Sequence, residues 1–349
     1  MAPPRVQNVT SRNNIKTFQG LRDILIMLVL GFQGSPRKKG NTNYLLSAFM
    51  EAVGKRGVQT HIVDVTQKNI EPCKEYVVCE KKGFCPINDD MKDEIYPLIR
   101  RAEVVVIATP IFFFNMTAQL KSVIDRCQTF WARKYKLKLK DPGASMRHGF
   151  LLAVGASKGK NLFDGLHLTS RYFFDAIWAS YEGSLTYRGI EDSKDMAKHP
   201  TVLEDIESAV ENLLKPFRGR KKVLFACREN ACRSQMASAF AQYLTGDKLD
   251  VINGGSEPAE KVNSDMVKVM HEKSIDMGFR IPKTIDEAIS HDTPEIIITM
   301  GCDEQCPIVP DAKRIDWDLP DPAGKSIEFM RDVRDDIERR VQDLINKLN

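Results

Sequence analysis

The feature that most constrains this chain is a regular alternation of short apolar runs with longer amphipathic stretches, and this alternation begins twice. Amphipathic stretches such as 41–57 and 234–244 separate the apolar runs, an order typical of βαβ units around a parallel sheet. After the stretch 201–214 comes the basic segment KPFRGRKK, and a fresh apolar run follows it. We therefore predict an α/β fold with two parallel-sheet, three-layer domains. The candidate strands are 24–32, 59–65, 103–110, 149–156, 222–227, 250–255 and 295–301.

The expected organisation follows from where the pattern stops and restarts. Residues 1–20 are predicted as a loose N-terminal extension, 21–214 as the first domain, 215–220 as a basic linker and 221–349 as the second domain. A length of 349 residues agrees with two domains of ordinary size.

Composition excludes several classes of protein. A net charge of +4 is too small to indicate nucleic-acid binding, and the apolar run 24–30 is too short to span a bilayer. Eight cysteines without a secretion signal indicate a reducing compartment, so we expect a cytoplasmic protein. Seven of these cysteines are clustered, and clustered thiols in such a compartment are typical of catalytic or metal-binding sites.

The motif CRENACRS (227–234) follows the apolar run KKVLFA (221–226) and precedes an amphipathic stretch. A loop wrapped around a tetrahedral anion points its backbone amides inward, and the next helix adds its positive end. Arg233 can clamp two oxygens of the anion, and the same field favours the thiolate of Cys227 as a nucleophile. Ser234 is placed to donate a hydrogen bond to that thiolate. The predicted oxyanion-binding residues are Arg228, Glu229, Asn230, Ala231, Cys232 and Arg233.

Asp321 in WDLPDPAGK is the candidate general acid. It precedes Pro322 and so lies on a loop, from which a carboxylic acid can protonate a leaving oxygen over the anion loop.

CRENACRS together with the Asp-Pro pair resembles the low-molecular-weight protein tyrosine phosphatase fold over 221–349. Phosphatases and arsenate reductases share that fold, and the sequence ITMGCDEQCPIVP favours the second. A hydrolytic phosphatase needs one thiolate, whereas the pair Cys302 and Cys306 is similar to the resolving cysteines of thioredoxin-coupled arsenate reductases. DPAGK also lacks the tyrosines usual after this aspartate in phosphatases.

The resemblance implies a thiol relay. Cys227 would attack arsenate with help from Asp321, Cys302 would then attack Cys227 and release arsenite, and Cys306 would leave a Cys302–Cys306 disulfide. The CDEQC spacing is shorter than is usual in that family. Some members bind potassium through an acidic residue where this chain has Ser238, so no metal site is expected.

Two alternatives concern the second domain's other cysteines. Cys232 is interpreted as structural. A zinc site from Cys302, Cys306 and His291 remains an alternative, although no fourth ligand is evident.

Three loops of the first domain follow candidate strands. GSPRKKGNT combines small, hydroxyl and basic residues before a helix, which suits a phosphate group. TPIFFFNMTAQLKSVIDR presents a flat aromatic stretch at a strand's carboxyl end, where ligands of open α/β sheets bind. VGASKGKN ends a third strand.

The first two of these stretches and LTYRGIEDSKDMAKHP resemble the flavodoxin-like NAD(P)H-dependent FMN reductases, in their iron–sulfur flavoprotein branch, over 24–214. The resemblance implies FMN as cofactor, NAD(P)H as electron donor and a homodimer. The implied contacts are Ser35, Arg37, Lys39, Asn41 and Thr42 for the phosphate, and Pro110, Ile111, Phe112, Phe113, Phe114 and Asn115 for the ring.

The segment EPCKEYVVCEKKGFC departs from that branch. Cys73, Cys79 and Cys85 keep the positions of three ligands of a [4Fe–4S] cluster, but Tyr76 replaces the remaining one. We therefore expect no cluster, and we expect the three thiols to be vestigial or to act as a redox relay.

Together the two domains predict arsenate reduction by Cys227, Cys302 and Cys306. The disulfide would be reduced by electrons from NAD(P)H through FMN on the same chain, directly or through Cys73, Cys79 or Cys85, or by thioredoxin. The alternatives are a phosphatase fused to a flavin reductase, a redox sensor that binds anions without turnover, and a flavin reductase with an inactive partner domain.

Overall fold

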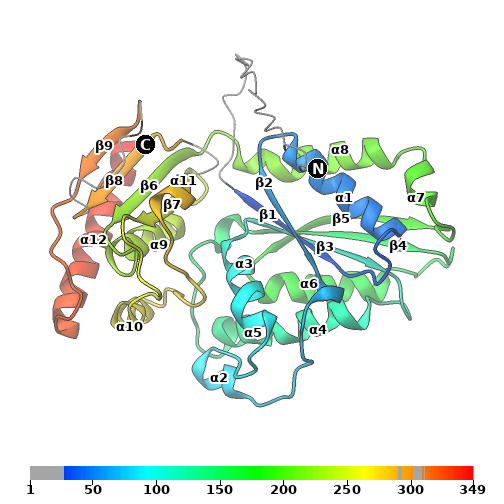
Figure 1. The fold of residues 1–349 in the computed structure, drawn as a ribbon, viewed down its shortest axis with the longest axis horizontal. Coiled ribbons are helices and arrows are strands. Elements are labelled where there is room, and N and C mark those ends of the chain that lie inside the picture. The colour runs from blue at the N-terminus through cyan, green and yellow to red at the C-terminus, as the bar shows by residue number, and fades with distance from the viewer. Residues whose placement is uncertain (1–26, 290–292, 302–308, 310, 349) are drawn as a thin grey trace, which may run out of the picture.

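The computed structural model describes residues 27–289, 293–301, 309 and 311–348, so the predicted extension 1–20 lies outside the described residues. The described strands form two separate sheets, and every strand pair in them is parallel. Helices cover both faces of each sheet (Figure 1). The predicted α/β fold with two parallel-sheet, three-layer domains is confirmed.

The first sheet has the strand order β2-β1-β3-β4-β5, which is the flavodoxin-like order. Its strands are β1 (Leu28–Gln33), β2 (Gln59–Asp64), β3 (Val104–Pro110), β4 (His148–Gly155) and β5 (Ser180–Arg188). Its helices are α1 (Asn41–Gly54), α2 (Val78–Lys82), α3 (Tyr96–Arg101), α4 (Ala118–Arg126), α5 (Gln128–Tyr135), α6 (Asp164–Ala176), α7 (Asp195–Lys198) and α8 (Val202–Leu214).

The second sheet has the order β7-β6-β8-β9. The segment 215–220 leads into it and packs against the protein, because Phe217 and Arg220 are both buried. The strands are β6 (Lys221–Cys227), β7 (Leu249–Gly255), β8 (Ile296–Met300) and β9 (Lys313–Asp316). The helices are α9 (Arg233–Thr245), α10 (Ser264–Glu272), α11 (Ile285–Ile289) and α12 (Ile327–Leu348).

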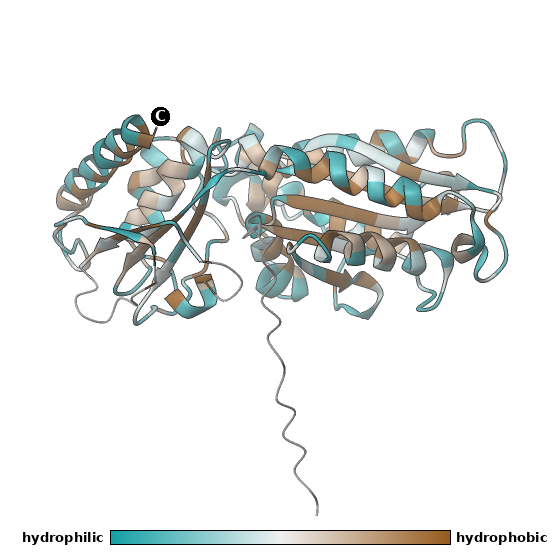
Figure 2. Ribbon diagram, turned by 90° about the horizontal axis from the view of Figure 1, so that it is seen from above, coloured by the Kyte–Doolittle hydropathy of each residue, from teal (hydrophilic) through white to brown (hydrophobic). Residues whose placement is uncertain are grey.

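Central strands that are apolar on both faces explain these layers. In β1, β3 and β6, alternate side chains enter the cores on opposite sides of the sheet, as expected for parallel strands covered by helices on both faces. Figure 2 shows these hydrophobic strands between helices whose outer faces are hydrophilic. None of the helices in the described ranges is long and apolar enough to cross a membrane.

Two edge strands, β5 and β9, were not among the predicted strands. β5 carries Tyr, Glu, Thr and Arg among smaller residues, and its side chains are mostly part-buried or exposed. β9 has four residues, KRID, and none of them is buried. An edge strand packs less apolar surface than a central one, so the apolar signal used for prediction is weak there.

The two domains meet at the amino ends of the first sheet's strands. A cavity of about 900 Å³ lies between the domains, lined by Leu28, Gln59 and Glu103 from strand starts of the first and by Gln242, Leu249 and Lys283 of the second. The predicted flavin loops follow the carboxyl ends of β1 and β3. The flavin end and the interdomain face are therefore opposite ends of the same sheet.

Candidate functional site

The loop 227–233 connects the end of β6 to the start of α9, as predicted. Its carbonyls face outward, because those of Cys227, Arg228, Glu229 and Ala231 accept hydrogen bonds from backbone amides in the segment 256–263. A peptide unit points its C=O and N–H in opposite directions, so the amides between these carbonyls face the inside of the loop. This arrangement suits an oxyanion, with the N-terminus of α9 adding its partial positive charge.

Cys227 is buried, and its Sγ lies 3.0 Å from the Ser234 Oγ. The Ser234 hydroxyl is also bound by Asn230. Its Oδ1 accepts from the Lys283 amide at 3.0 Å, which fixes the carboxamide orientation, and its Nδ2 therefore donates to the Ser234 Oγ at 2.8 Å. The Ser234 oxygen accepts from Asn230, and once Cys227 is a thiolate the Ser234 hydroxyl is the group that can donate in the contact between them.

Asn230 is the centre of the loop's support. Its side chain is fully buried, and its backbone is in the left-handed region with φ 50°. Its Nδ2 also donates to the Asn253 Oδ1 at 2.9 Å, and its Oδ1 also accepts from the Gln235 Nε2 at 3.2 Å. The prediction treated Asn230 only as part of the anion loop. Asn253, a polar residue within the apolar stretch VINGG of β7, was the sequence signal for this network.

Arg233 and Asp321 lie together, although they are far apart in the chain. The Arg233 Nη2 is 3.1 Å from the Asp321 Oδ2, and its Nη1 donates to the Leu319 carbonyl at 3.1 Å. Arg233 is buried, whereas the Asp321 side chain is half exposed at 51%. The predicted clamp and the predicted acid therefore share one edge of the loop.

The contact between Arg233 and Asp321 bridges 88 residues of chain. Their contact depends on how the loop before α12 packs over α9. Asp321 is held there by its own turn, since its Oδ1 accepts from the Ala323 amide at 3.1 Å.

Cys232 lies in the same loop, and its side chain is buried. Burial raises the pKa of the Cys232 thiol to about 12, and the nearby charges of Cys227 and Asp321 act in the same direction. Cys232 is therefore protonated at neutral pH and is a poor nucleophile. This agrees with the interpretation of Cys232 as structural.

Cys302, Cys306 and His291 lie outside the described residues. The described chain reaches Gly301, directly after β8, whose Met300 is the register partner of Cys227. A Cβ built at Gly301 would lie 2.8 Å from the Arg233 Nη1, and the φ of Gly301 is +68°. The residue before Cys302 is therefore beside the anion loop.

Ser238, where no metal site was expected, contacts an arginine. Its Oγ accepts from the Arg280 Nη1 at 3.0 Å and from the Asn253 Nδ2 at 3.1 Å. Arg280 had no sequence signal, since it stands in an ordinary stretch, MGFRIPK.

The predicted phosphate residues of the first domain surround the start of α1. Ser35 and Thr42 are buried, and Arg37 and Lys39 are exposed. Gly40 caps the helix without a side-chain hydrogen bond, and the first turn has no acidic residue. These features fit the phosphate of FMN, because a helix N-terminus with hydroxyl and basic neighbours favours an anion.

Asn41, one of the predicted phosphate contacts, also joins two segments of the first domain. Its Nδ2 donates to the Asp192 carbonyl at 2.9 Å, and its Oδ1 accepts from the Met196 amide at 3.2 Å. Asn41 thereby brings the segment TYRGIEDSKDM beside the phosphate loop.

The predicted ring residues form a tight turn after β3. Phe112 and Asn115 exchange backbone hydrogen bonds of 2.8 and 3.0 Å, and Phe113 and Phe114 have φ values of 47° and 60°. All three phenylalanines are exposed, with Phe113 fully so, while Pro110 and Ile111 are part-buried. An exposed aromatic turn beside the phosphate loop is a suitable wall for a flat ring.

Cys73, Cys79 and Cys85 lie near one another. Burial raises the pKa of the Cys79 thiol, and the charges of Cys85 and Cys73 raise it further. Tyr76 is exposed. Within the described ranges, no group of three or more His, Cys, Asp or Glu side chains is arranged to hold a metal ion.

Two arginines, the buried Arg126 and the part-buried Arg133, fix this cysteine segment. Arg126 pairs with Asp89 at 2.6 Å and donates to the Glu71 carbonyl at 2.8 Å, which holds both ends of the segment. Arg133 donates to the Gly83 carbonyl at 2.7 Å.

Two known protein families match this chain. Residues 27–171 match the family described as NADPH-dependent FMN reductase, and residues 222–349 match the family described as low molecular weight phosphotyrosine protein phosphatase. The first match supports FMN as cofactor and NAD(P)H as electron donor.

Individual relatives divide in the same way. A putative arsenate reductase of Halobacterium salinarum is 39% identical over 135 residues, which are 36% of this chain and 91% of the relative. A glutaredoxin arsenate reductase of Synechocystis is 36% identical over 131 residues, 37% of this chain and 99% of the relative. An iron-sulfur flavoprotein of Methanosarcina thermophila is 34% identical over 143 residues, 41% of this chain and 74% of the relative. The chain is thus an oxidoreductase that belongs to the iron-sulfur flavoproteins through its first domain and to the arsenate reductases of the low-molecular-weight phosphatase fold through its second.

Proposed function

We propose that this protein reduces arsenate to arsenite through a thiol relay that begins at Cys227. The observation that carries the proposal is the buried Cys227 sulfur, 3.0 Å from a Ser234 hydroxyl whose hydrogen is available to it. A thiolate in that position is stabilised by a hydrogen bond and by the N-terminus of α9.

The first step is attack of the Cys227 thiolate on arsenic. Arg233 would leave Asp321 to bind two arsenate oxygens. The half-exposed Asp321 carboxylate, released from its ion pair, would take up a proton from solvent and give it to the departing oxygen, which leaves as water. A bond from sulfur to pentavalent arsenic forms, and one arsenic–oxygen bond breaks.

The second step reduces the arsenic. The Cys302 thiolate attacks the Cys227 sulfur, and the electron pair of the sulfur–arsenic bond stays on arsenic, which leaves as trivalent arsenite. Cys306 then displaces Cys227 from Cys302. Two thiolates have lost two electrons and arsenic has gained two. The position of Gly301 beside Arg233 supports Cys302 as the attacking thiol.

The flavin domain is the proposed source of electrons for the remaining disulfide. Ser35, Thr42, Arg37 and Lys39 would hold the phosphate of FMN, and the turn 110–115 would flank its ring. Bound FMN supplies a two-electron reductant drawn from NAD(P)H.

The path of these electrons is constrained by the sheet. β3 has seven residues, so the flavin end lies about 20 Å from the interdomain face at about 3.3 Å per residue. A flavin reduces a disulfide at close range. We therefore propose that the electrons reach the second domain from the flavin end of a second copy of the chain or through thioredoxin, in preference to a direct path within one chain.

The test is arsenate-dependent NAD(P)H oxidation by FMN-loaded protein, with and without thioredoxin, beside a Cys227→Ser control. Arsenite formation that is lost in the control supports the proposal, and the thioredoxin arm identifies the carrier. If neither arm forms arsenite, the proposal is wrong.

A phosphatase is the second candidate, because the Arg233–Asp321 pair would serve phosphate-ester hydrolysis equally well. Hydrolysis of p-nitrophenyl phosphate that survives Cys302→Ser, without arsenite formation by the unmodified chain, would favour it.

A further inference from the structure

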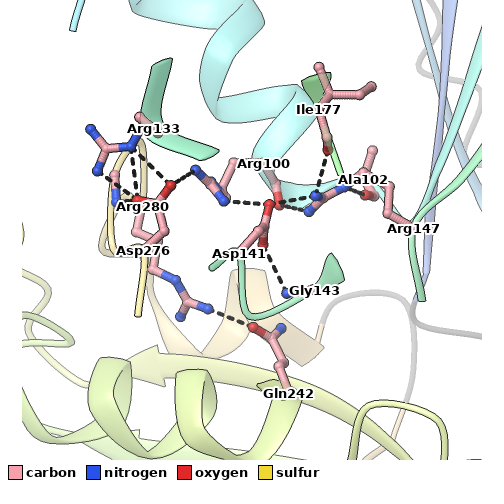
Figure 3. A network of polar contacts seen from close by, with 11 residues as sticks. Arg100, Ala102, Arg133, Asp141, Gly143, Arg147, Ile177, Gln242, Asp276 and Arg280 are labelled. Carbon is pink, nitrogen blue, oxygen red and sulfur yellow. Dashed lines mark hydrogen bonds and ion pairs between the residues drawn. The ribbon is translucent and has the colours of Figure 1, made fainter. Parts of the chain in front are cut away.

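One loop of the second domain, residues 273–283, contacts both the first domain and the support of the anion loop. Its first contact is Asp276, which is 1% exposed and lies between Arg100 and Arg133 of the first domain (Figure 3). The Asp276 Oδ2 accepts from the Arg100 Nη2 at 2.7 Å, and the Oδ1 accepts from the Arg133 Nη2 at 2.6 Å.

The backbone and an aromatic ring of this loop are fixed in the same place. The Lys140 amide donates to the Ser274 carbonyl at 2.8 Å, and the Asp276 amide donates to the Lys140 carbonyl at 2.9 Å. Phe279 packs against Tyr96 and Phe130, with ring centroids 4.9 and 5.1 Å apart. The loop is therefore held by ion pairs, backbone bonds and apolar contacts at once.

The far end of the loop holds α9. The Arg280 Nη1 lies 3.3 Å from the Gln235 Oε1 and 3.0 Å from the Ser238 Oγ, and its Nη2 donates to the Gln242 Oε1 at 2.5 Å. Burial lowers the pKa of Arg280 to about 10, so the guanidinium remains charged at neutral pH.

A continuous set of hydrogen bonds leads from Arg280 to the nucleophile. The Gln235 side chain accepts from Arg280 and donates to the Asn230 Oδ1, Asn230 donates to the Ser234 Oγ, and Ser234 lies 3.0 Å from the Cys227 Sγ. Gln235, Asn230 and Ser234 are all at most 1% exposed, so water does not compete for these bonds.

We propose that docking of the flavin domain sets the reactivity of Cys227 through the loop 273–283, with Arg280 as a positioning residue. Asp276 fixes the loop, Arg280 orients Gln235, and the carboxamide of Asn230 is kept in the orientation that leaves the Ser234 hydrogen to the Cys227 thiolate. The inference rests on the proposed role of Cys227 as nucleophile. It gives the first domain a structural action on the arsenate site besides electron supply.

The test measures carbamidomethylation of Cys227 by iodoacetamide at pH 7 in the full-length protein, by peptide mass spectrometry. The exposed Cys73 is the internal reference. Asp276→Asn and Arg280→Gln are each expected to slow the reaction of Cys227 about fivefold. This effect is smaller than that of losing a charged hydrogen bond completely, because Lys283 and Asn253 still hold Asn230.

Two further variants make the test specific. Lys273 lies in the same loop and forms an exposed ion pair with Glu338 of α12. Lys273→Gln removes that pair and is expected to leave the alkylation rate of Cys227 unchanged. The double variant of Asp276→Asn and Arg280→Gln is expected to be no slower than the slower single variant, because both act through one path.

The inference is overturned if Cys227 of folded Asp276→Asn protein is alkylated at the rate of the unmodified protein. It is also overturned if the effects of Asp276→Asn and Arg280→Gln multiply in the double variant. Arg280→Lys, which keeps the charge with fewer donors, is expected to recover part of the rate. Alkylation needs no arsenate. If the variants slow the alkylation of Cys227 as expected but the unmodified protein forms no arsenite, only the proposed function is refuted.

Discussion

The most informative stability experiment is Asp276→Asn, because it removes one buried charge at the boundary of the two domains. Asp276 accepts hydrogen bonds from both Arg100 and Arg133 (Figure 3). Removing one partner of a buried ion pair costs about 3–5 kcal/mol. Arg100 keeps its pair with Asp141, and Arg133 keeps the Gly83 carbonyl, so we expect the lower end, about 3 kcal/mol.

The pH dependence of this contribution has a definite sign. Burial alone would raise the pKa of Asp276, but the charges of Arg100 and Arg133 lower it well below its usual value of 3.8. A depressed pKa in the folded state gives stability that is fully present above about 3.8 and is lost as the pH falls further. Docking is therefore expected to be constant between neutral pH and about pH 4 and to weaken in more acid solution.

Two measurements check the expected loss of stability in Asp276→Asn. With about 1–3 kcal/mol lost per molar urea, a loss of about 3 kcal/mol lowers the midpoint by about 1 M or more. Hydrogen exchange of residues 273–283 should accelerate about a hundredfold. Lys273→Gln is the control. An Asp276→Asn protein with unchanged midpoint and unchanged exchange would refute the reasoning that the ion pairs hold the domains together.

Three further predictions concern the two sites. Ser234→Ala removes the hydroxyl beside the Cys227 sulfur and should lower kcat/KM for arsenate about 10-fold or more, since a hydrogen bond to a charged group contributes about 1.5–3 kcal/mol. Single-turnover arsenite formation measures this loss. An unchanged rate would exclude the hydroxyl from thiolate stabilisation. Cys232→Ala should change turnover less than about threefold, because the Cys232 thiol is protonated at neutral pH, and steady-state assays of that variant beside Cys227→Ser check this. In Ser35→Glu chains the added charge repels the phosphate of FMN. Mixing these chains with Cys227→Ser chains should recover arsenate-dependent NAD(P)H oxidation that neither variant has alone. A mixture that stays inactive even with thioredoxin would indicate electron transfer within one chain.

Local sequence was sufficient for the parts of each site that lie on one strand, loop and helix. The spacing of Cys227, Arg233 and Ser234 predicted a loop between a strand and a helix, and the structure has β6 and α9 there. The reason is that hydrophobic periodicity and the six-residue spacing act over a few residues of chain. The same reasoning missed β5 and β9, whose side chains at the sheet edges are too polar to give a periodic apolar signal.

The support of the nucleophile could not be predicted in this way. Asn230 is held by Gln235, Asn253 and Lys283, and the last two are 23 and 53 residues away in the chain. Arg280 gave no signal because an arginine near a helix is usually solvated. Only the fold shows that its guanidinium is turned onto α9.

By itself the sequence determined that this chain makes two parallel α/β domains, and which loops are the candidates for thiol and phosphate chemistry. Tertiary structure alone decided how the domains dock, with Asp276 buried between two arginines more than a hundred residues away. It also decided that the flavin loops and the interdomain face lie at opposite ends of one sheet. Element formation depends on neighbouring residues, whereas docking depends on the match of two complete surfaces, which no local pattern contains.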